Sequence, residues 1–246
     1  MNIQAILFDI NGTLIDIQTD EGSEEIYRGI SHFLTYQGIY IHRWEVRDEY
    51  FRLMEEQRRV RGEAFPEFDA VELWRQFLRR RPEACHSMPP EKLRWMPIFL
   101  AEMYRGVSRY RLQLYPEVKT ALDELAQCFK LAALSDAQSA WALPEMRAVG
   151  IEAYFQPIIV SGDLGFRKPD KRIFEAALNG LNLPPENILF VGNDMYRDIY
   201  GAKQFGMKTV FFSSNQGRQT ANGVEPDYII YRFAELRQAI AFFEAQ

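Results

Sequence analysis

The stretch IQAILFDINGTL, residues 3–14, decides the fold of this 246-residue chain. A short apolar run ends at Phe8, a carboxylate follows at Asp9, and Gly12 allows a sharp turn directly afterwards. An apolar run of this length that is bounded by a turn signal is typical of a buried strand. We therefore expect a first strand over residues 3–8 that presents Asp9 at its carboxyl end.

Five further apolar segments continue the pattern, and helical patterns lie between them. The segments cover residues 130–134, 157–160, 187–191, 208–212 and 227–230, and the helical patterns include residues 116–127, 171–181 and 198–205. Buried strands that alternate with helices predict a parallel sheet covered on both faces. The predicted fold class is therefore α/β, with a doubly wound, Rossmann-like parallel sheet.

Residues 16–111 follow a different pattern. Helical patterns cover residues 24–37, 43–59, 70–80 and 91–104, and no clear strand interrupts them. Insertions in the exposed loops of a stable fold are well tolerated. We expect a core domain of residues 1–15 and 112–246, and an all-helical domain of residues 16–111 inserted into it.

Composition and charge argue against several classes of partner. The hydrophobic content of 47% and charged content of 26% are those of a soluble globular protein, and the net charge of -5 gives no reason to expect nucleic acid or an anionic membrane. No apolar run approaches the ~20 residues of a membrane span, and the N-terminus has the pattern of a strand rather than of a signal peptide. Cys85 and Cys128 form no disulfide framework, so we expect both to be buried in a reduced, cytoplasmic protein.

Polar side chains lie at or after four of the expected strands. Asp9 follows the first strand, Ser135 follows the second, Lys168 precedes a proline whose neighbour has a restricted backbone, and Asp194 and Asp198 follow another apolar run. The carboxyl ends of parallel strands converge at one edge of a sheet, which is where catalytic groups collect in α/β folds. The sequence therefore predicts one site built from these side chains.

In this order the four motifs resemble those of the haloacid dehalogenase-like (HAD) hydrolases, and the helical insert resembles the cap domain of subfamily I. The resemblance covers the core on both sides of the insert, whereas the insert matches only in position and helical character. It implies that Asp9 attacks phosphorus to form an aspartyl-phosphate. It also implies that Thr13 orients Asp9, that Ser135 donates a hydrogen bond to the phosphoryl group, and that Lys168 neutralises its charge.

The resemblance also implies two sets of binding residues. The expected substrate-binding residues are Gly12, Thr13, Ser135, Asp136 and Lys168. Asp136 stands where the family often has asparagine, and we expect it to point away from the phosphate or to pair with Lys168.

The expected Mg²⁺ ligands are Asp9, the main-chain oxygen of Asn11, Asn193, Asp194 and Asp198. Two registers of the last motif stay open. In one, Asn193 replaces the first aspartate of the family's acidic motif; in the other, Asp194 and Asp198 form the acidic pair. Mg²⁺ prefers hard oxygen ligands, which both registers supply.

Asn11 is the one departure in the first motif. The family's aspartate at this position protonates the leaving oxygen and then activates water, and an amide does neither near neutral pH. Another carboxylate, such as Asp16, Asp20 or Glu21, could be brought in to replace it. An engineered change of aspartate to Asn11 is also compatible with the sequence.

These motifs predict a Mg²⁺-dependent phosphatase that hydrolyses a small phosphomonoester, as a monomer or homodimer. One alternative is a weakly active or non-catalytic protein that binds a phosphorylated ligand. A second is a 2-haloacid dehalogenase-type enzyme, because displacement of halide needs no protonated leaving group. Those dehalogenases use no metal and lack the acidic motif, whereas Asp194 and Asp198 are present here, which disfavours the second alternative.

Overall fold

The computed structural model describes residues 2–245, except for the side chain of Cys85. Strand β1 (Ala5–Phe8) lies inside a six-stranded parallel sheet of order β5–β4–β1–β6–β7–β8. The other five strands are β4 (Lys130–Ser135), β5 (Ile158–Val160), β6 (Ile188–Gly192), β7 (Lys208–Phe212) and β8 (Tyr228–Ile230). The predicted doubly wound α/β sheet is confirmed. The chain crosses from one side of β1 to the other, which opens a crevice at the carboxyl end of this strand.

Alternate side chains of β1 pack into two separate cores. Ile6 and Phe8 join a core with α6 (Val118–Leu125), α7 (Ser139–Ala148) and α11 (Leu236–Glu244). Ala5 and Leu7 join a second core with α9 (Lys171–Leu181) and α10 (Gly201–Lys203) on the opposite face. Both faces of the sheet are therefore covered, as the uninterrupted apolar pattern of the strand requires. Short helical segments complete this part of the chain: η1 (Glu152–Tyr154), α8 (Ser161–Leu164), η2 (Pro185–Asn187), η3 (Met195–Tyr200) and η4 (Phe233–Glu235).

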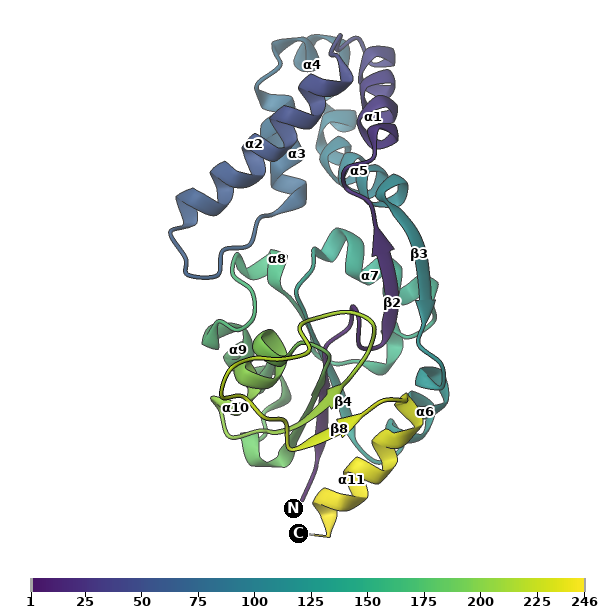
Figure 1. Cartoon of the computed structure of the whole chain (residues 1–246). Helices are drawn as coiled ribbons and strands as arrows, with labels where there is room; N and C mark the ends of the chain where they lie inside the picture. Colours follow the sequence, from purple (N-terminus) through teal and green to yellow (C-terminus); the bar gives the residue numbers. More distant parts are fainter. Residues whose placement is uncertain (1, 246) are drawn as a thin grey trace.

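Five helices between β1 and β4 form a third hydrophobic core of their own. Figure 1 shows them gathered at one end of the molecule, away from the two termini. Stacked Tyr50 and Tyr104, with ring centroids 4.3 Å apart, pack at its centre beside the fully buried Trp74. The helices, called the cap helices below, are α1 (Glu24–Tyr36), α2 (Arg43–Arg61), α3 (Ala70–Arg79), α4 (Pro82–Ser87) and α5 (Pro90–Ser108).

Two strands connect the cap helices to the core, and the expectation that residues 16–111 hold no strand is wrong at both ends. Strands β2 (Ile15–Thr19) and β3 (Arg109–Leu114) pair antiparallel between the sheet and the cap helices (Figure 1). Four of the six side chains of β3 are polar or charged, so this strand carries little of the apolar signal of a buried strand. The expected domain boundaries at residues 15/16 and 111/112 fall inside these two strands.

The cap helices are also fixed to the core through α7. Glu145 of this helix is buried and accepts hydrogen bonds from Arg105 Nε at 2.7 Å and Arg109 Nη1 at 3.2 Å. Trp141 Nε1 donates to the carbonyl of Ala101 at 2.8 Å. These contacts hold α5 against the core beside the two connecting strands.

A second connection is made by the segment of residues 62–69, called the cap loop below. Gln138 of the core is buried, and its side chain donates to Phe68 O at 2.7 Å and accepts from Ala70 N at 2.9 Å. Farther along, Arg167 N donates to Phe65 O at 3.0 Å. The cap loop therefore lies against the loops that follow β4 and β5, at the carboxyl edge of the sheet.

Cys128 lies exposed in the turn after α6, so the expected burial of this thiol is wrong. The expectation for Cys85 concerns a side chain outside the described atoms. Within residues 2–245, no helix combines the length and the hydropathy that a membrane span requires.

Candidate active site

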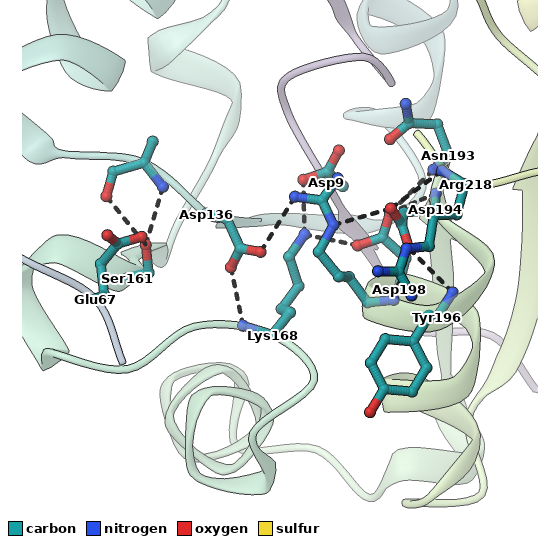
Figure 2. A network of polar contacts seen from close by, with 12 residues as sticks. Asp9, Glu67, Asp136, Ser161, Lys168, Asn193, Asp194, Tyr196, Asp198 and Arg218 are labelled. Atoms are coloured by element: carbon teal, nitrogen blue, oxygen red, sulfur yellow. Dashed lines mark hydrogen bonds and ion pairs between the residues drawn. The ribbon is translucent and has the colours of Figure 1, made fainter. Parts of the chain in front are cut away.

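Three neighbouring strands end at one edge and bring the predicted side chains together. Asp9 follows β1, Ser135 ends β4, and Asn193 follows β6. Lys168 enters from the loop after α8, and Figure 2 shows its side chain beside Asp9. Asp9 is buried, and its main-chain N–H donates to Val191 O at 2.9 Å, which continues the pairing of β1 with β6. The candidate site therefore lies where β4 and β6 diverge from β1 on either side.

Gly12 is required by the turn that follows Asp9. Its φ of +89° lies in the left-handed region, and a Cβ at this position would lie 2.2 Å from Asn193 Nδ2. The side chain of Asn193 therefore packs directly against the turn. No residue with a Cβ fits there without displacing Asn193.

Asp9 is held by one donor on each carboxylate oxygen. Thr13 Oγ1 donates to Asp9 Oδ2 at 2.9 Å, and Lys168 Nζ donates to Asp9 Oδ1 at 2.7 Å. The same ammonium donates to Asp198 Oδ1 at 2.6 Å and to Leu134 O at 3.1 Å. All three protons of Lys168 are thus used inside the protein, and they fix the orientation of the Asp9 carboxylate.

Burial and charge act against each other in this cluster. Desolvation alone would lower the pKa of Lys168, but the charges of Asp198, Asp9 and Asp136 outweigh it and raise the pKa above its ordinary value. Burial raises the pKa of Asp198 to about 6, although the charge of Lys168 opposes the rise. The site is therefore a buried ammonium between two buried carboxylates, with Lys168 charged at neutral pH.

The Asp194 carboxylate caps the turn that begins η3. Its Oδ1 accepts from Tyr196 N at 3.0 Å and Arg197 N at 2.8 Å, and its Oδ2 accepts from Arg197 Nε at 2.9 Å and Arg218 N at 3.1 Å. Burial would raise the pKa of Asp194, but these donors and the charge of Arg197 hold it below its ordinary value. Both oxygens of this carboxylate already have protein partners.

The Asn193 side chain contacts a different set of groups from Asp194. Its Oδ1 lies 3.3 Å from Thr13 Oγ1, and its Nδ2 donates to Ser214 Oγ at 3.3 Å. Because Thr13 also bonds to Asp9, the Asn193 amide lies on the Asp9 side of the loop. Asp198 Oδ2 accepts from the main-chain N–H groups of both Asn193 and Asp194, so it fixes the loop that follows β6.

Ser135 and Asp136 carry unused hydrogen-bonding capacity. Within residues 2–245, neither Ser135 Oγ nor Asp136 Oδ2 has a hydrogen-bond partner, although both atoms are buried. Asp136 Oδ1 accepts from the main-chain N–H of Lys168 at 2.9 Å, and Oδ2 lies 3.5 Å from Arg197 Nη1. Burial raises the pKa of Asp136, against the lowering effect of Lys168. The expected pairing with Lys168 is thus made through the main chain and not through the ammonium.

Asn11 lies half-buried in the turn after Asp9, and no described residue makes a hydrogen bond to its side chain. None of the carboxylates considered as replacements for an aspartate here is free and buried. Asp16 is buried but pairs with Arg111 Nη2 at 2.5 Å, and Asp20 and Glu21 are exposed.

Two charged residues near the site were not singled out from the sequence. Arg197 forms ion pairs with Asp194 and Asp136. Its spacing of three residues from Asp194 could have indicated the first of these pairs from the sequence. Glu67 of the cap loop is buried, accepts from Ser161 Oγ at 3.1 Å, and has a pKa raised by burial. Figure 2 shows Glu67 on the far side of Asp136 from Lys168. Its contact with Ser161 therefore joins the cap loop to the core. No sequence pattern near Glu67 indicated this contact.

Comparison with known proteins identifies relatives over the whole chain. The family profile described as haloacid dehalogenase-like hydrolase matches residues 3–206. A protein of Pyrococcus furiosus named glyceraldehyde 3-phosphate phosphatase is 25% identical over 99% of this chain and 94% of its own length. The pyrophosphatase PpaX of Bacillus velezensis is 26% identical over 95% of this chain and 94% of its own.

Among solved structures, 2-haloacid dehalogenase from Pseudomonas syringae pv. Tomato DC3000 aligns with a TM-score of 0.70. The alignment covers 98% of this chain and 99% of the other, at 22% sequence identity. At this level of identity, the likeness shows a shared fold and nothing about the reaction.

Replacing Lys168 by Met leaves Asp9 and Asp198 buried without their shared cation. Breaking a buried ion pair from one side costs ~3–5 kcal/mol, so we expect Lys168→Met to lower the free energy of unfolding at neutral pH. Loss of the ammonium raises the pKa of Asp198 beyond about 6, whereas the unfolded chain titrates near the ordinary value. The folded variant then binds more protons than the unfolded one, so its stability falls as pH rises above about 4.

Urea unfolding without magnesium at about pH 5 and about pH 7.5 measures the free energy of unfolding of Lys168→Met and of the unsubstituted protein. We expect the variant to lose more of this free energy at the higher pH. Lys171→Met removes a charge at an exposed position and serves as the matched control. An equal deficit at both pH values would contradict the assigned role of the two carboxylates.

Proposed function

This chain belongs to the haloacid dehalogenase-like hydrolases, and we propose that it is a phosphatase that acts on a small phosphomonoester through an aspartyl-phosphate on Asp9. The observation that carries the proposal is the buried Asp9–Lys168 pair next to the hydroxyl of Ser135, which is buried and has no partner among the described residues. Proteins rarely leave a buried hydroxyl unpaired, so this one is available to a ligand oxygen. The phosphatase names of the relatives support the same reaction class.

The proposed first step is an in-line displacement at phosphorus. A carboxylate oxygen of Asp9 forms the new P–O bond, the ester P–O bond breaks, and the alcohol oxygen leaves with that electron pair. Thr13 fixes the attacking carboxylate, and Lys168 offsets the charge of the phosphoryl oxygens. Ser135 Oγ donates to a phosphoryl oxygen. Asp136 Oδ2, which is buried and has no hydrogen-bond partner among the described residues, is the second group that we assign to the substrate.

Asn11 weakens two steps of this reaction. The leaving alkoxide receives no proton from residue 11, and the water that later hydrolyses the aspartyl-phosphate loses no proton to it. General acid–base catalysis is worth roughly 10²–10⁴-fold, which corresponds to about 3–5 kcal/mol of barrier. We therefore propose a slow phosphatase that favours esters with good leaving groups.

The oxygen atoms around Asp9 fit a Mg²⁺ ion, although they carry little charge. We assign the ion to Asp9, the main-chain oxygen of Asn11 and Asn193 Oδ1, all hard oxygen donors of the kind that Mg²⁺ prefers. Asp198 contributes negative charge nearby while bonding to Lys168. Asp194 is less suited because each of its oxygens already accepts two hydrogen bonds from the protein, whereas each oxygen of Asp9 accepts one. When bound, the ion neutralises phosphoryl charge as a Lewis acid.

One observation favours a dehalogenase-type reaction as a second candidate. In the sequence, the acidic motif argued against a dehalogenase. In the structure, Asp194 caps η3 and the neutral Asn193 faces the Asp9 side. The site therefore holds fewer free carboxylates than the motif implied. Attack of Asp9 on a carbon–halogen bond releases halide and requires no acid at position 11. Release of halide from a 2-haloacid in the presence of EDTA would favour this candidate over the phosphatase.

Restoring the acid is the direct test of the phosphatase. We expect Asn11→Asp to raise kcat for an alkyl phosphate by roughly 10²–10⁴-fold, and to raise it less for 4-nitrophenyl phosphate, whose leaving group needs no proton. Asp9→Asn should abolish turnover of both esters. Steady-state kinetics with and without magnesium provide the measurement.

Asn222→Asp adds the same charge at an exposed position and controls for charge alone. If Asn11→Asp leaves kcat unchanged, another group carries the proton. If the protein hydrolyses no phosphate ester with or without magnesium, it is a phospho-ligand-binding protein instead.

The two registers of the metal motif predict different effects of substitutions at Asn193 and Asp194 on Mg²⁺ binding. We expect Asn193→Asp to bind Mg²⁺ more tightly than the unsubstituted protein, because a charged oxygen replaces a neutral one on the Asp9 side. Asp194→Asn should lower the melting temperature, because the neutral amide keeps one acceptor oxygen for the cap but loses the charge-assisted bond to Arg197, and it should leave the shift caused by magnesium nearly unchanged. Thermal unfolding over a magnesium titration measures both, and loss of the magnesium shift in Asp194→Asn would favour Asp194 as ligand.

A further inference from the structure

A pocket of about 430 Å³ adjoins the candidate active site at the junction of cap and core. Phe65 of the cap loop forms one side of it, and the loops after α8, β6 and β7 form the rest. Lys168 lines this pocket and also donates to Asp9, so this residue is shared by the pocket and the candidate active site. The rest of a substrate whose phosphoryl group lay at Asp9 would enter this space past Lys168.

Two guanidinium groups at this pocket lack carboxylate partners. Arg167 and Arg218 line it, and neither forms an ion pair with any residue in the described range 2–245. The other cations are already balanced, since Lys168 pairs with Asp9 and Asp198, and Arg197 pairs with Asp194. The pocket therefore holds an excess of positive charge at Arg167 and Arg218.

The main chain of both arginines is fixed. Arg167 N donates to Phe65 O at 3.0 Å, which ties it to the cap loop. Arg218 N donates to Asp194 Oδ2 at 3.1 Å, and Arg218 O accepts from Met195 N at 2.9 Å. Groups held in place before a ligand arrives lose less entropy on binding it.

Aromatic rings supply the remaining wall. The Arg218 guanidinium lies 5.5 Å from the centroid of the Tyr196 ring, and Phe65 meets the same ring nearly edge-on at 6.4 Å. A cation over an aromatic face keeps its N–H edge free for an anion. The Tyr196 ring also stacks on Tyr200 at 5.4 Å, which steadies it.

We propose that this pocket binds a second anionic group of the substrate, a carboxylate or a phosphate carried a few bonds away from the ester phosphate. The planar fork of an arginine matches both groups, and Arg167 and Arg218 are the donors. The inference rests on the proposed phosphatase and narrows its substrates to small phosphomonoesters with an additional negative charge. Asp194, the one carboxylate at the pocket, has donors on both oxygens and does not compete with the ligand for the arginines.

Two esters of similar size test the proposal. 3-Phosphoglycerate ends in a carboxylate where glycerol 3-phosphate ends in a neutral alcohol. A charge-assisted hydrogen bond supports roughly 10- to 100-fold discrimination, so we expect kcat/KM to favour 3-phosphoglycerate by that factor, mainly through KM. Arg218→Gln and Arg167→Gln should each reduce the preference several-fold, and the double variant should remove it.

Arg94→Gln is the matched control, since Arg94 is exposed on α5 and also forms no ion pair within residues 2–245. Calorimetric titration of both esters into the magnesium-loaded protein reports the subsite even where turnover is too slow to measure. Tighter binding of 3-phosphoglycerate that depends on Arg218 and Arg167, without turnover, would retain the subsite and reject the phosphatase. Equal affinities for the two esters, or a preference that survives the double variant, would overturn the inference.

Discussion

The ammonium of Lys168 is the group on which the arrangement of the site depends. It is buried between Asp9 at 2.7 Å and Asp198 at 2.6 Å, and it joins residues that follow β1 and β6 to the loop that follows α8. Removing this ammonium would leave two buried carboxylates without their shared cation. The same contact therefore fixes the orientation of the Asp9 carboxylate and joins three loops at the site.

Two neighbouring residues of the loop after β6, Asn193 and Asp194, have different roles that the sequence alone does not distinguish. Asp194 stabilises the start of η3 and positions Arg197 and Arg218, while the neutral Asn193 faces Thr13 and the Asp9 side. Together with Asn11, this leaves the site with a nucleophile and a shared cation but with few free carboxylates. Such a site stabilises charge on a phosphoryl group better than it transfers protons.

The parallel sheet and the grouping of Asp9, Ser135 and Lys168 could be predicted from the sequence because strand ends in such sheets converge. The strands β2 and β3 were missed because polar residues alternate with apolar or aromatic ones in both, whereas the expected strands are short runs of apolar residues. The direction of Asp194 could not be predicted, since it depends on donors as distant along the chain as Arg218. The unpaired charge of Arg167 and Arg218 likewise follows only from where carboxylates end up in three dimensions.

The central claim is that Asp9 can attack a phosphoryl group while nothing at position 11 helps water to remove it. Rapid acid quench of the protein with a ³²P-labelled activated phosphate ester, followed by mass spectrometry of the peptide that contains Asp9, tests this directly. The account predicts phosphorylated Asp9 that accumulates in the protein with Asn11, that decays quickly in Asn11→Asp, and that is absent in Asp9→Asn. Turnover of the ester without any label on Asp9 in the protein with Asn11, or label that persists in Asp9→Asn, would contradict it.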